Sequence, residues 1–436
     1  MLRILLVTIF FVVLNFGQTL AAEKGPKIRV GLVTNQFSAQ LEAKGNIKIS
    51  GNKSLTLKPG KHFVSMKKGV LYVNNTKVGG NSITITGAKG STPVYINKKN
   101  YRGALTVAVN KDKKTLNVIN TLNLEDYLYG VVAKEVMPLW PDEAIKAQAV
   151  AARSFALYEL NQSSYPNYDI KANEMGQVYG GLGAEHSNTT KLIDATKGMA
   201  VTYQGSPIQA FFHSTSGGYT ESAAYVWGNP VPYLQAVVDY DQEAPSFNWE
   251  KVYTKEQLSR ALNQGGYAVG ELEGIRLSEL KQAPMKATED RGISGRVRRI
   301  TFKGKKSSVT LTGDKVRSLL GLNSTLFEVA VGLQRPDYLE VPILNRYGMQ
   351  IGSKKIPIKK DGRGTAYKGS LGDLHLLTDV KDEKIIFTGR GWGHGLGMSQ
   401  WGARGMAQSK AAKGKKDYYK NILTHYYTGT KVERVY

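Results

Sequence analysis

Apolar and polar residues alternate in short stretches from Lys27 to about Asn117, and turns rich in glycine, asparagine and lysine separate them. The alternation is clearest at Lys27 to Val33, Leu71 to Val73, Ser82 to Thr86 and Leu105 to Val109. A period of two with abundant valine, isoleucine and threonine is typical of β-strands, because successive side chains of a strand point to opposite faces. The pattern therefore predicts a β-rich module over residues 27–115.

The spacing of apolar residues becomes helical near residue 122. Positions 124, 127, 128, 131 and 132 are apolar, which predicts a helix over Leu124 to Glu135. Pro138 and Pro141 end this helix, because each lacks a backbone donor and disfavours helical geometry in its predecessor. Pro141 also fits the start of a second helix, from Asp142 to about Asn161. Its many alanines allow close approach of neighbours, so we expect it to be buried.

The rest of the chain mixes both patterns. Strand and turn segments rich in glycine and tyrosine run to about residue 239, and one helical stretch lies near 254–264. Further strands are expected at 297–302, 308–311 and 384–387, before a final helix and strand. The sequence therefore predicts an α+β fold in which the N-terminal module precedes a second region over 116–436. The densest motifs of that region fall in 116–239 and 384–436, and residues 240–383 connect them.

The first 22 residues differ from the rest of the chain. A basic start at Met1 to Arg3 precedes an apolar run from Ile4 to Phe16, and Thr19 to Ala22 are mostly small. This order is typical of a signal peptide, and an uncleaved anchor is the alternative. We expect the mature chain to be exported to the cell wall or the extracytoplasmic face. No later apolar segment is long enough to predict a membrane span.

Composition narrows the chemistry. The 436 residues contain 59 lysines and arginines against 35 acids, a formal charge of +24, and no cysteine. Cysteine-ligated metals, disulfides and a cysteine nucleophile are therefore excluded. The sequence has no nucleic-acid-binding signature, so we expect the charge to attract an anionic surface such as a cell wall. A merely solvated basic surface is the alternative.

Glu135 is the leading candidate for acid–base chemistry. It closes the first predicted helix among Val131, Val132, Val136 and Met137. An apolar environment and the negative end of a helix dipole both raise the pKa of a carboxyl group, as a general acid at neutral pH requires. The alternative is an ordinary exposed carboxylate, paired with Lys134 or Arg153.

Two other motifs invite a chemical interpretation. His213 and Ser214 suggest a serine hydrolase, but the chain lacks a G-x-S-x-G elbow and offers no assignable orienting acid. The segment GWGHGLGMSQWG, residues 391–402, lacks both the P-loop and the dinucleotide-binding patterns. We expect a loop that exposes its backbone, in which Trp392 and Trp401 either stack on sugar rings or pack in the core.

Four segments carry a family resemblance: LEDYLYGVVAKEVMPLWPDEAIKAQAVAARSFAL, QVYGG, FFHSTSGGYTESAAYVWG with PYL, and GRGWGHGLGMSQWGARGMA. Together they resemble the bacterial SpoIID/LytB family of stage II sporulation protein D-like lytic transglycosylases and amidase enhancers. The resemblance extends from about Tyr101 to the C-terminus.

The resemblance implies cleavage of peptidoglycan strands between N-acetylmuramic acid and N-acetylglucosamine, with 1,6-anhydro ends as products. The family's catalytic glutamate corresponds to Glu135, although Val136 is inserted before the Met-Pro pair. Some members hold zinc through cysteine and histidine; without cysteine, no metal or other cofactor is expected here. The residues expected to bind substrate are Gln177, Tyr179, His213, Ser214, Ser216, Trp392, His394, Ser399 and Gln400.

The same resemblance leaves a second function open. The chain is either the enzyme just described, acting in wall remodelling or sporulation, or a non-catalytic wall-binding partner that stimulates an N-acetylmuramoyl-L-alanine amidase. Peptidoglycan strands, anionic wall polymers and a cell-wall amidase are the expected partners.

Overall fold

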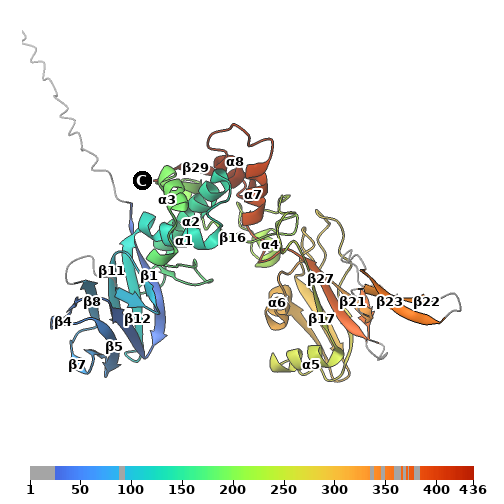
Figure 1. Cartoon of the computed structure of the whole chain (residues 1–436), viewed down its shortest axis with the longest axis horizontal. Helices are drawn as coiled ribbons and strands as arrows, with labels where there is room; N and C mark the ends of the chain where they lie inside the picture. The colour runs from blue at the N-terminus through green and yellow to red at the C-terminus, as the bar shows by residue number, and fades with distance from the viewer. Residues whose placement is uncertain are drawn as a thin grey trace, which may run out of the picture.

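The computed structural model describes residues 25–87, 94–333, 338–344, 349–357, 365–366, 370–371, 373–377 and 383–436. The predicted signal peptide lies outside these residues. The described part is an α+β structure, as the sequence predicts. Figure 1 shows two β-rich lobes on opposite sides of a central helical region. No described helix has the length and hydropathy to cross a bilayer.

Two sheets form the N-terminal lobe around one apolar core. The larger sheet has the order β13 (Ile170–Lys171), β1 (Lys27–Gln36), β12 (Leu116–Asn123), β11 (Ala104–Val109), β8 (Ser82–Gly87), β3 (Ile47–Ser50) and β4 (Leu55–Leu57). The smaller has the order β10 (Lys99–Asn100), β9 (Val94–Ile96), β2 (Ser38–Ala43), β5 (Gly60–Lys67), β6 (Val70–Val73) and β7 (Thr76–Lys77). Strands lie at all four stretches with the clearest alternation. Because β12 belongs to the larger sheet, that sheet continues past residue 115 to the first helix.

The central region begins with the two predicted helices. Helix α1 spans Leu124–Glu135, and the Asn123 side chain caps it by accepting the N–H of Glu125. Helix α2 spans Asp142–Gln162 and buries its alanines, as predicted. The two helices are joined by a buried ion pair, in which Arg153 lies 2.8 Å from a carboxylate oxygen of Glu125. Helix α3, Ser187–Ala195, packs against both.

The second lobe has its own apolar core. One sheet orders β17 (Asn248–Tyr253), β27 (Lys384–Arg390), β21 (Phe327–Leu333) and β24 (Thr365–Ala366). Another orders β20 (Ser308–Thr312), β19 (Arg299–Gly304), β18 (Leu272–Arg276), β26 (Leu374–Leu376) and β25 (Ser370–Leu371). Helices α5 (Lys255–Gln264) and α6 (Gly313–Leu320) pack on this core, and β22 (Tyr338–Leu344) pairs with β23 (Gln350–Pro357). The helix expected near 254–264 is therefore confirmed.

The C-terminal segments return to the central region. Strand β29 (Lys431–Arg434) pairs with β14 (Met199–Tyr203), which also pairs with β15 (Ser206–Pro207). Helix α8 (Tyr419–Tyr426) packs against α2 and against α7 (Gln400–Gln408). The loop predicted over residues 391–402 is wrong from residue 400 onward, since α7 begins there. Ser399 caps the start of this helix by accepting a hydrogen bond from the Gly402 N–H. The dense glycines of the segment favour a loop and so hide this helix start in the sequence.

Candidate active site

Glu135 is the last residue of α1, and local sequence fixes its position. Val136 adopts an extended conformation as the C-cap, and Pro138 follows. The carbonyl of Pro138 accepts a hydrogen bond of 2.7 Å from the side-chain amide of Asn188, next to the start of α3. The helix end and the turn after it are therefore both held, and they place Glu135 half-buried at the edge of the helical core.

The environment of Glu135 favours its neutral form. Burial raises the pKa of this carboxyl group, whereas hydrogen bonds from the Gln400 side chain and the Val178 backbone, together with the charge of Lys134, lower it by less. The apolar surroundings thus act as the sequence predicts. Arg153, a partner considered for Glu135, instead binds Glu125. A carboxyl group whose pKa is raised by burial keeps its proton to higher pH than an exposed one, which suits a proton donor.

Gln400 connects Glu135 to a distant part of the chain. Its Nε2 donates to Oε2 of Glu135 over 3.1 Å. Gln400 opens α7 and is nearly fully buried, and the next residue, Trp401, packs edge-to-face on Trp140 with ring centroids 5.1 Å apart. Trp401 therefore packs against the core edge and fixes the helix start that carries Gln400.

Two short strands join the HSTS and GHGLGMSQ motifs. Strand β16 (Phe212–His213) runs parallel to β28 (Met398–Ser399), with His213 opposite Ser399. A second bridge pairs Thr215 with Trp392 through backbone hydrogen bonds of 2.8 and 3.1 Å. The structure therefore places these two predicted motifs side by side, and Gln400 extends the same assembly to Glu135.

His213 and His394 lie together within this assembly, with ring centroids 5.4 Å apart. Burial lowers the pKa of His213 well below 6.5 and that of His394 to about 4, so both rings are neutral at neutral pH. Nδ1 of His394 accepts the Leu396 N–H over 3.0 Å, and its ring donates to the Phe212 carbonyl. Nδ1 of His213 lies 3.0 Å from the Leu396 carbonyl, which requires that nitrogen to carry the proton.

The family resemblance raises the question of a zinc ion at these two histidines. Both ring nitrogens of His394 are engaged by the backbone, which leaves Nε2 of His213 as the unpaired ring nitrogen of the pair. A structural zinc ion needs four ligands and a catalytic one needs three. Among the described residues, no group of three or more histidines and acids is placed to supply them. This site does not fit a zinc ion.

A buried acidic network supports the same motifs. Asp239 accepts hydrogen bonds of 2.5 Å from the hydroxyls of Ser216 and Tyr426, and one from Ser399. Asp241 accepts from the Thr215 hydroxyl and, over 2.8 Å, from the Gly217 N–H. Burial, followed by repulsion from Asp241, raises the pKa of Asp239 to about 6. The hydroxyls of Ser216 and Ser399 are thus committed to holding the two motifs together.

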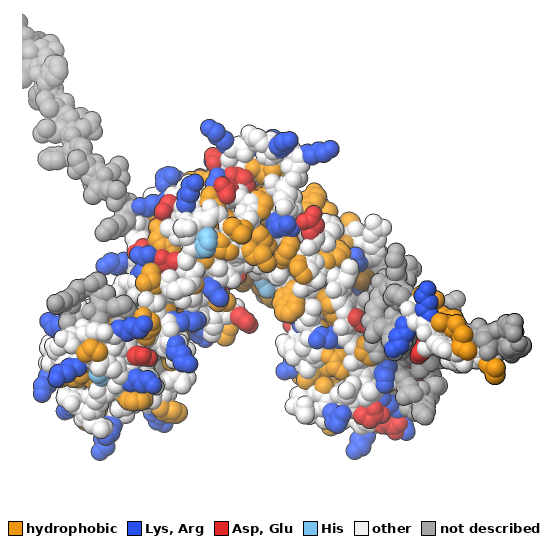
Figure 2. All heavy atoms as spheres, in the orientation of Figure 1, with side chains coloured by type: hydrophobic (Ala, Val, Ile, Leu, Met, Phe, Trp, Pro, Cys, Tyr) orange, Lys and Arg blue, Asp and Glu red, His pale blue; other side chains and the backbone are white. Residues whose placement is uncertain are grey.

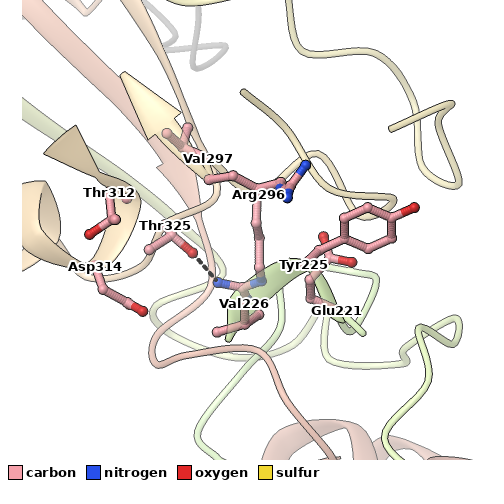
Figure 3. A pocket seen from close by; sticks show the side chains of 10 residues that line it. Glu221, Tyr225, Val226, Arg296, Val297, Thr312, Asp314 and Thr325 are labelled. Atoms are coloured by element: carbon pink, nitrogen blue, oxygen red, sulfur yellow. Dashed lines mark hydrogen bonds between the residues drawn. The ribbon is translucent and has the colours of Figure 1, made fainter. Parts of the chain in front are cut away.

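Arg296 links the motifs to the second lobe. Its guanidinium donates to the carbonyls of Ser216 and Gly393 over 2.8 and 3.2 Å, and to the Thr325 hydroxyl over 3.3 Å. Figure 3 shows this side chain beside a cavity of about 50 Å³ that Glu221 and Tyr225 also line. Burial lowers the pKa of Arg296 to about 10, which leaves it charged at neutral pH.

The remaining predicted residues divide into two groups. Gln177 and Tyr179 point into the core, where Gln177 donates to the Ala152 carbonyl over 3.2 Å and Tyr179 donates to Asn120 over 3.2 Å. Their contribution to the site is the backbone between them, because Val178 donates to Glu135. Ser214 is half-buried and its carbonyl accepts the Trp401 N–H. Trp392 remains 49% exposed, and its side chain is free to meet a ligand.

Sequence reasoning did not identify Asp239, Asp241 or Arg296. Asp239 and Asp241 form an Asp-x-Asp pair a few residues after the PYL motif. Two alternating acids beside an apolar segment are the sequence feature that could have indicated a buried acidic pair. Arg296 belongs to the basic segment at residues 296–299, whose charge favours an exposed position, yet it is 2% exposed. A basic run therefore concealed a structural cation.

Comparison with known proteins adds an independent observation. The model of the SpoIID family, described as stage II sporulation protein, matches residues 112–203, and a domain of unknown function (DUF8618) matches residues 228–341. An uncharacterised protein of Brachyspira hyodysenteriae is 30% identical over 77% of this chain and 73% of its own length.

Two relatives from Bacillus subtilis have names that describe a role. Its amidase enhancer is 30% identical over 85% of this chain, and the match spans half of that longer protein. Its stage II sporulation protein D is 28% identical over 72% of this chain and 75% of its own length.

Proposed function

The chain belongs to the SpoIID family, and on that premise we propose that it is an exported lytic transglycosylase that cleaves peptidoglycan glycan strands with Glu135. The observation that carries this proposal is the state of Glu135: a half-buried carboxyl group with a raised pKa, oriented by Gln400. The signal-like start and the charge of +24 suit a protein that works in an anionic wall.

One carboxyl group is sufficient for the reaction. Neutral Glu135 donates its proton to the oxygen that leaves with N-acetylglucosamine as the bond from C1 of N-acetylmuramic acid breaks. The resulting carboxylate then accepts the proton of the muramic C6 hydroxyl, whose oxygen bonds to C1 and closes the 1,6-anhydro ring. The proton returns to Glu135, so acid and base are one residue and no water is consumed.

The groups that shift the pKa of Glu135 support a mechanism with a single carboxyl group, since they include no second carboxylate. Hydrolases that add water to a glycosidic bond generally use two carboxyl groups. The Gln400 side-chain amide donates a hydrogen bond that stabilises the Glu135 carboxylate. This carboxylate is the product of the first proton transfer and the base in the second.

Exposed aromatic side chains offer surfaces for sugar rings. Trp227 is 44% exposed and packs on Phe211 with centroids 4.7 Å apart, and Phe211 in turn contacts His394. Trp392 is similarly exposed beside Thr215. We expect the indole rings of Trp227 and Trp392 to stack on sugar rings of the glycan strand. The neutral side chains of His213 and His394 hold the loop backbone in place.

Stimulation of an amidase is the second candidate function. It is favoured by the amidase enhancer of Bacillus subtilis, which is as similar in sequence as any other relative named above. In this role the basic surface binds the wall and Glu135 is dispensable.

The two functions give different products. Incubation with peptide-free glycan strands should yield 1,6-anhydro ends if the chain is a transglycosylase. An enhancer instead yields no glycan products, and its stimulation of an amidase survives Glu135→Ala but declines with salt, because screening weakens contacts between exposed charges.

A further inference from the structure

A cavity of about 300 Å³ opens between the N-terminal lobe and the end of α1. We call it the lysine cavity, because three of the side chains that line it are those of Lys98, Lys99 and Lys134. Asn100 and the backbone around Gly180 and Gly183 complete the lining. Its volume is at the lower end of the range for sites that bind small molecules or polymer substituents.

The hairpin that carries two of the lysines has a defined geometry. Strands β9 and β10 pair Ile96 with Lys99, so that Asn97 and Lys98 form a two-residue turn. Both turn residues have positive φ, 49° and 64°. A two-residue type I′ turn requires positive φ at both positions, and its twist matches that of the paired strands. The turn therefore holds Lys98 and Lys99 at a fixed place on the rim of the cavity.

The hairpin also contacts the central region. A side chain at Gly181 would meet the Asn100 carbonyl at 2.4 Å, so the two backbones are in direct contact. Arg102 binds Glu185 through two hydrogen bonds of 2.7 Å, and the rings of Tyr101 and Tyr179 lie 5.5 Å apart. The N-terminal lobe thus contributes one wall of a cavity whose other wall is the end of α1.

The lysines of the cavity are available to an incoming anion. The ion pairs formed by the described residues do not include any of the three lysines. Glu185, which follows the lining residue Ala184 in the chain, is already neutralised by Arg102. The three exposed lysines that line the cavity carry like charges, and an anion bound between them relieves their mutual repulsion.

Lys134 lines the cavity and directly precedes Glu135, and it lies close enough for its charge to act on that carboxyl group. A glycan strand of N-acetylmuramic acid and N-acetylglucosamine carries negative charge as carboxylates, either on the lactyl ether of a peptide-free muramic acid or on an attached peptide. We propose that the lysine cavity is a subsite that binds a carboxylate of the strand on which Glu135 acts. This inference rests on the proposed function and adds a role for the N-terminal lobe in substrate recognition.

The test measures binding rather than turnover. The full chain with Glu135→Gln, which is expected to be inactive, is titrated at low salt with peptide-free strands, peptide-bearing strands and neutral N-acetylglucosamine oligomers. Lys98→Gln/Lys99→Gln is added to remove two charges. Lys134 is kept, because its charge acts on Glu135. Lys48→Gln/Lys61→Gln is the control, since it removes the same charge from exposed positions of the same lobe.

We expect the cavity variant to bind one or both carboxylate-bearing strands about tenfold more weakly, and the neutral oligomers unchanged. Loss confined to peptide-free strands assigns the lactyl carboxylate, and loss confined to peptide-bearing strands assigns the peptide. A loss no larger than in the control, or equal on neutral oligomers, overturns the subsite and leaves the role of Glu135 standing. Failure of the Glu135→Gln protein with intact lysines to bind any strand overturns both proposals.

Discussion

The side-chain amide of Gln400 donates a hydrogen bond to Glu135 over 3.1 Å, between residues 265 positions apart in the chain. This contact joins the end of α1 to the start of α7. Gln400 directly follows Ser399, which lies opposite His213 in the pair of short strands. The predicted catalytic glutamate and the two glycine-rich motifs thus form one continuous assembly.

Replacing Gln400 should move the pH dependence of cleavage. The Gln400 hydrogen bond lowers the pKa of Glu135, so Gln400→Leu raises that pKa further. The acid form then persists to higher pH, and the limb of the pH profile where kcat/KM falls with rising pH moves to higher pH. Gln408→Leu, on the exposed end of the same helix, is the control. A limb that stays in place or moves down in Gln400→Leu would contradict this account of Glu135.

Gly395 should tolerate no side chain. Its φ is +83°, and an added Cβ would lie 2.2 Å from Nε of the buried Arg296. Gly228 has nearly the same φ, +84°, but nothing lies within 4 Å of its added Cβ. Gly228→Ala should therefore show the backbone cost alone, about 1 kcal/mol, and Gly395→Ala about 2–4 kcal/mol. Urea unfolding measures the difference, and equal losses would show that Arg296 does not pack tightly beneath this loop.

Asp239 should make stability depend on pH in an unusual direction. Its folded pKa of about 6 lies above the ordinary 3.8, so the folded state holds the proton more tightly than the unfolded chain. The stabilisation is fully present below about pH 4 and is lost as pH rises through 6. Asp239→Asn removes this dependence.

The measurement compares the free energy of unfolding of the unmodified protein with that of Asp239→Asn across pH. The free energy of unfolding of the unmodified protein should fall relative to that of Asp239→Asn by about 1–3 kcal/mol between pH 4 and pH 7. Parallel pH profiles of the two proteins would mean that folding does not raise the pKa of Asp239.

Local patterns predict the helices that carry the site. The apolar spacing of 124–132 and the Pro141 start give α1 and α2 with bounds within one residue of those in the structure. These features act within a few residues and so remain visible in the sequence. The raised pKa of Glu135 was predictable for the same reason, since its apolar neighbours adjoin it in the chain.

Features that depend on distant contacts were not predictable. The parallel pairing of β16 with β28 joins segments 186 residues apart (Phe212 with Met398), and neither strand is long enough to show a pattern. Gln177 and Tyr179 look like ligands because they are polar and flank glycine, yet alternation along the chain turns both inward and leaves the Val178 backbone facing Glu135. Side-chain direction at such positions is decided by packing rather than by local sequence.

The central claim is that Glu135 performs the cleavage. The most direct measurement is the rate at which peptide-free glycan strands gain 1,6-anhydro ends with the unmodified protein, with Glu135→Gln and with Glu159→Gln. Glu159 is the matched control, because it is a half-buried glutamate on the neighbouring helix whose pKa is also raised by burial. We predict a loss of at least about 100-fold in Glu135→Gln and little change in Glu159→Gln. Equal rates for Glu135→Gln and the unmodified protein would contradict the assignment.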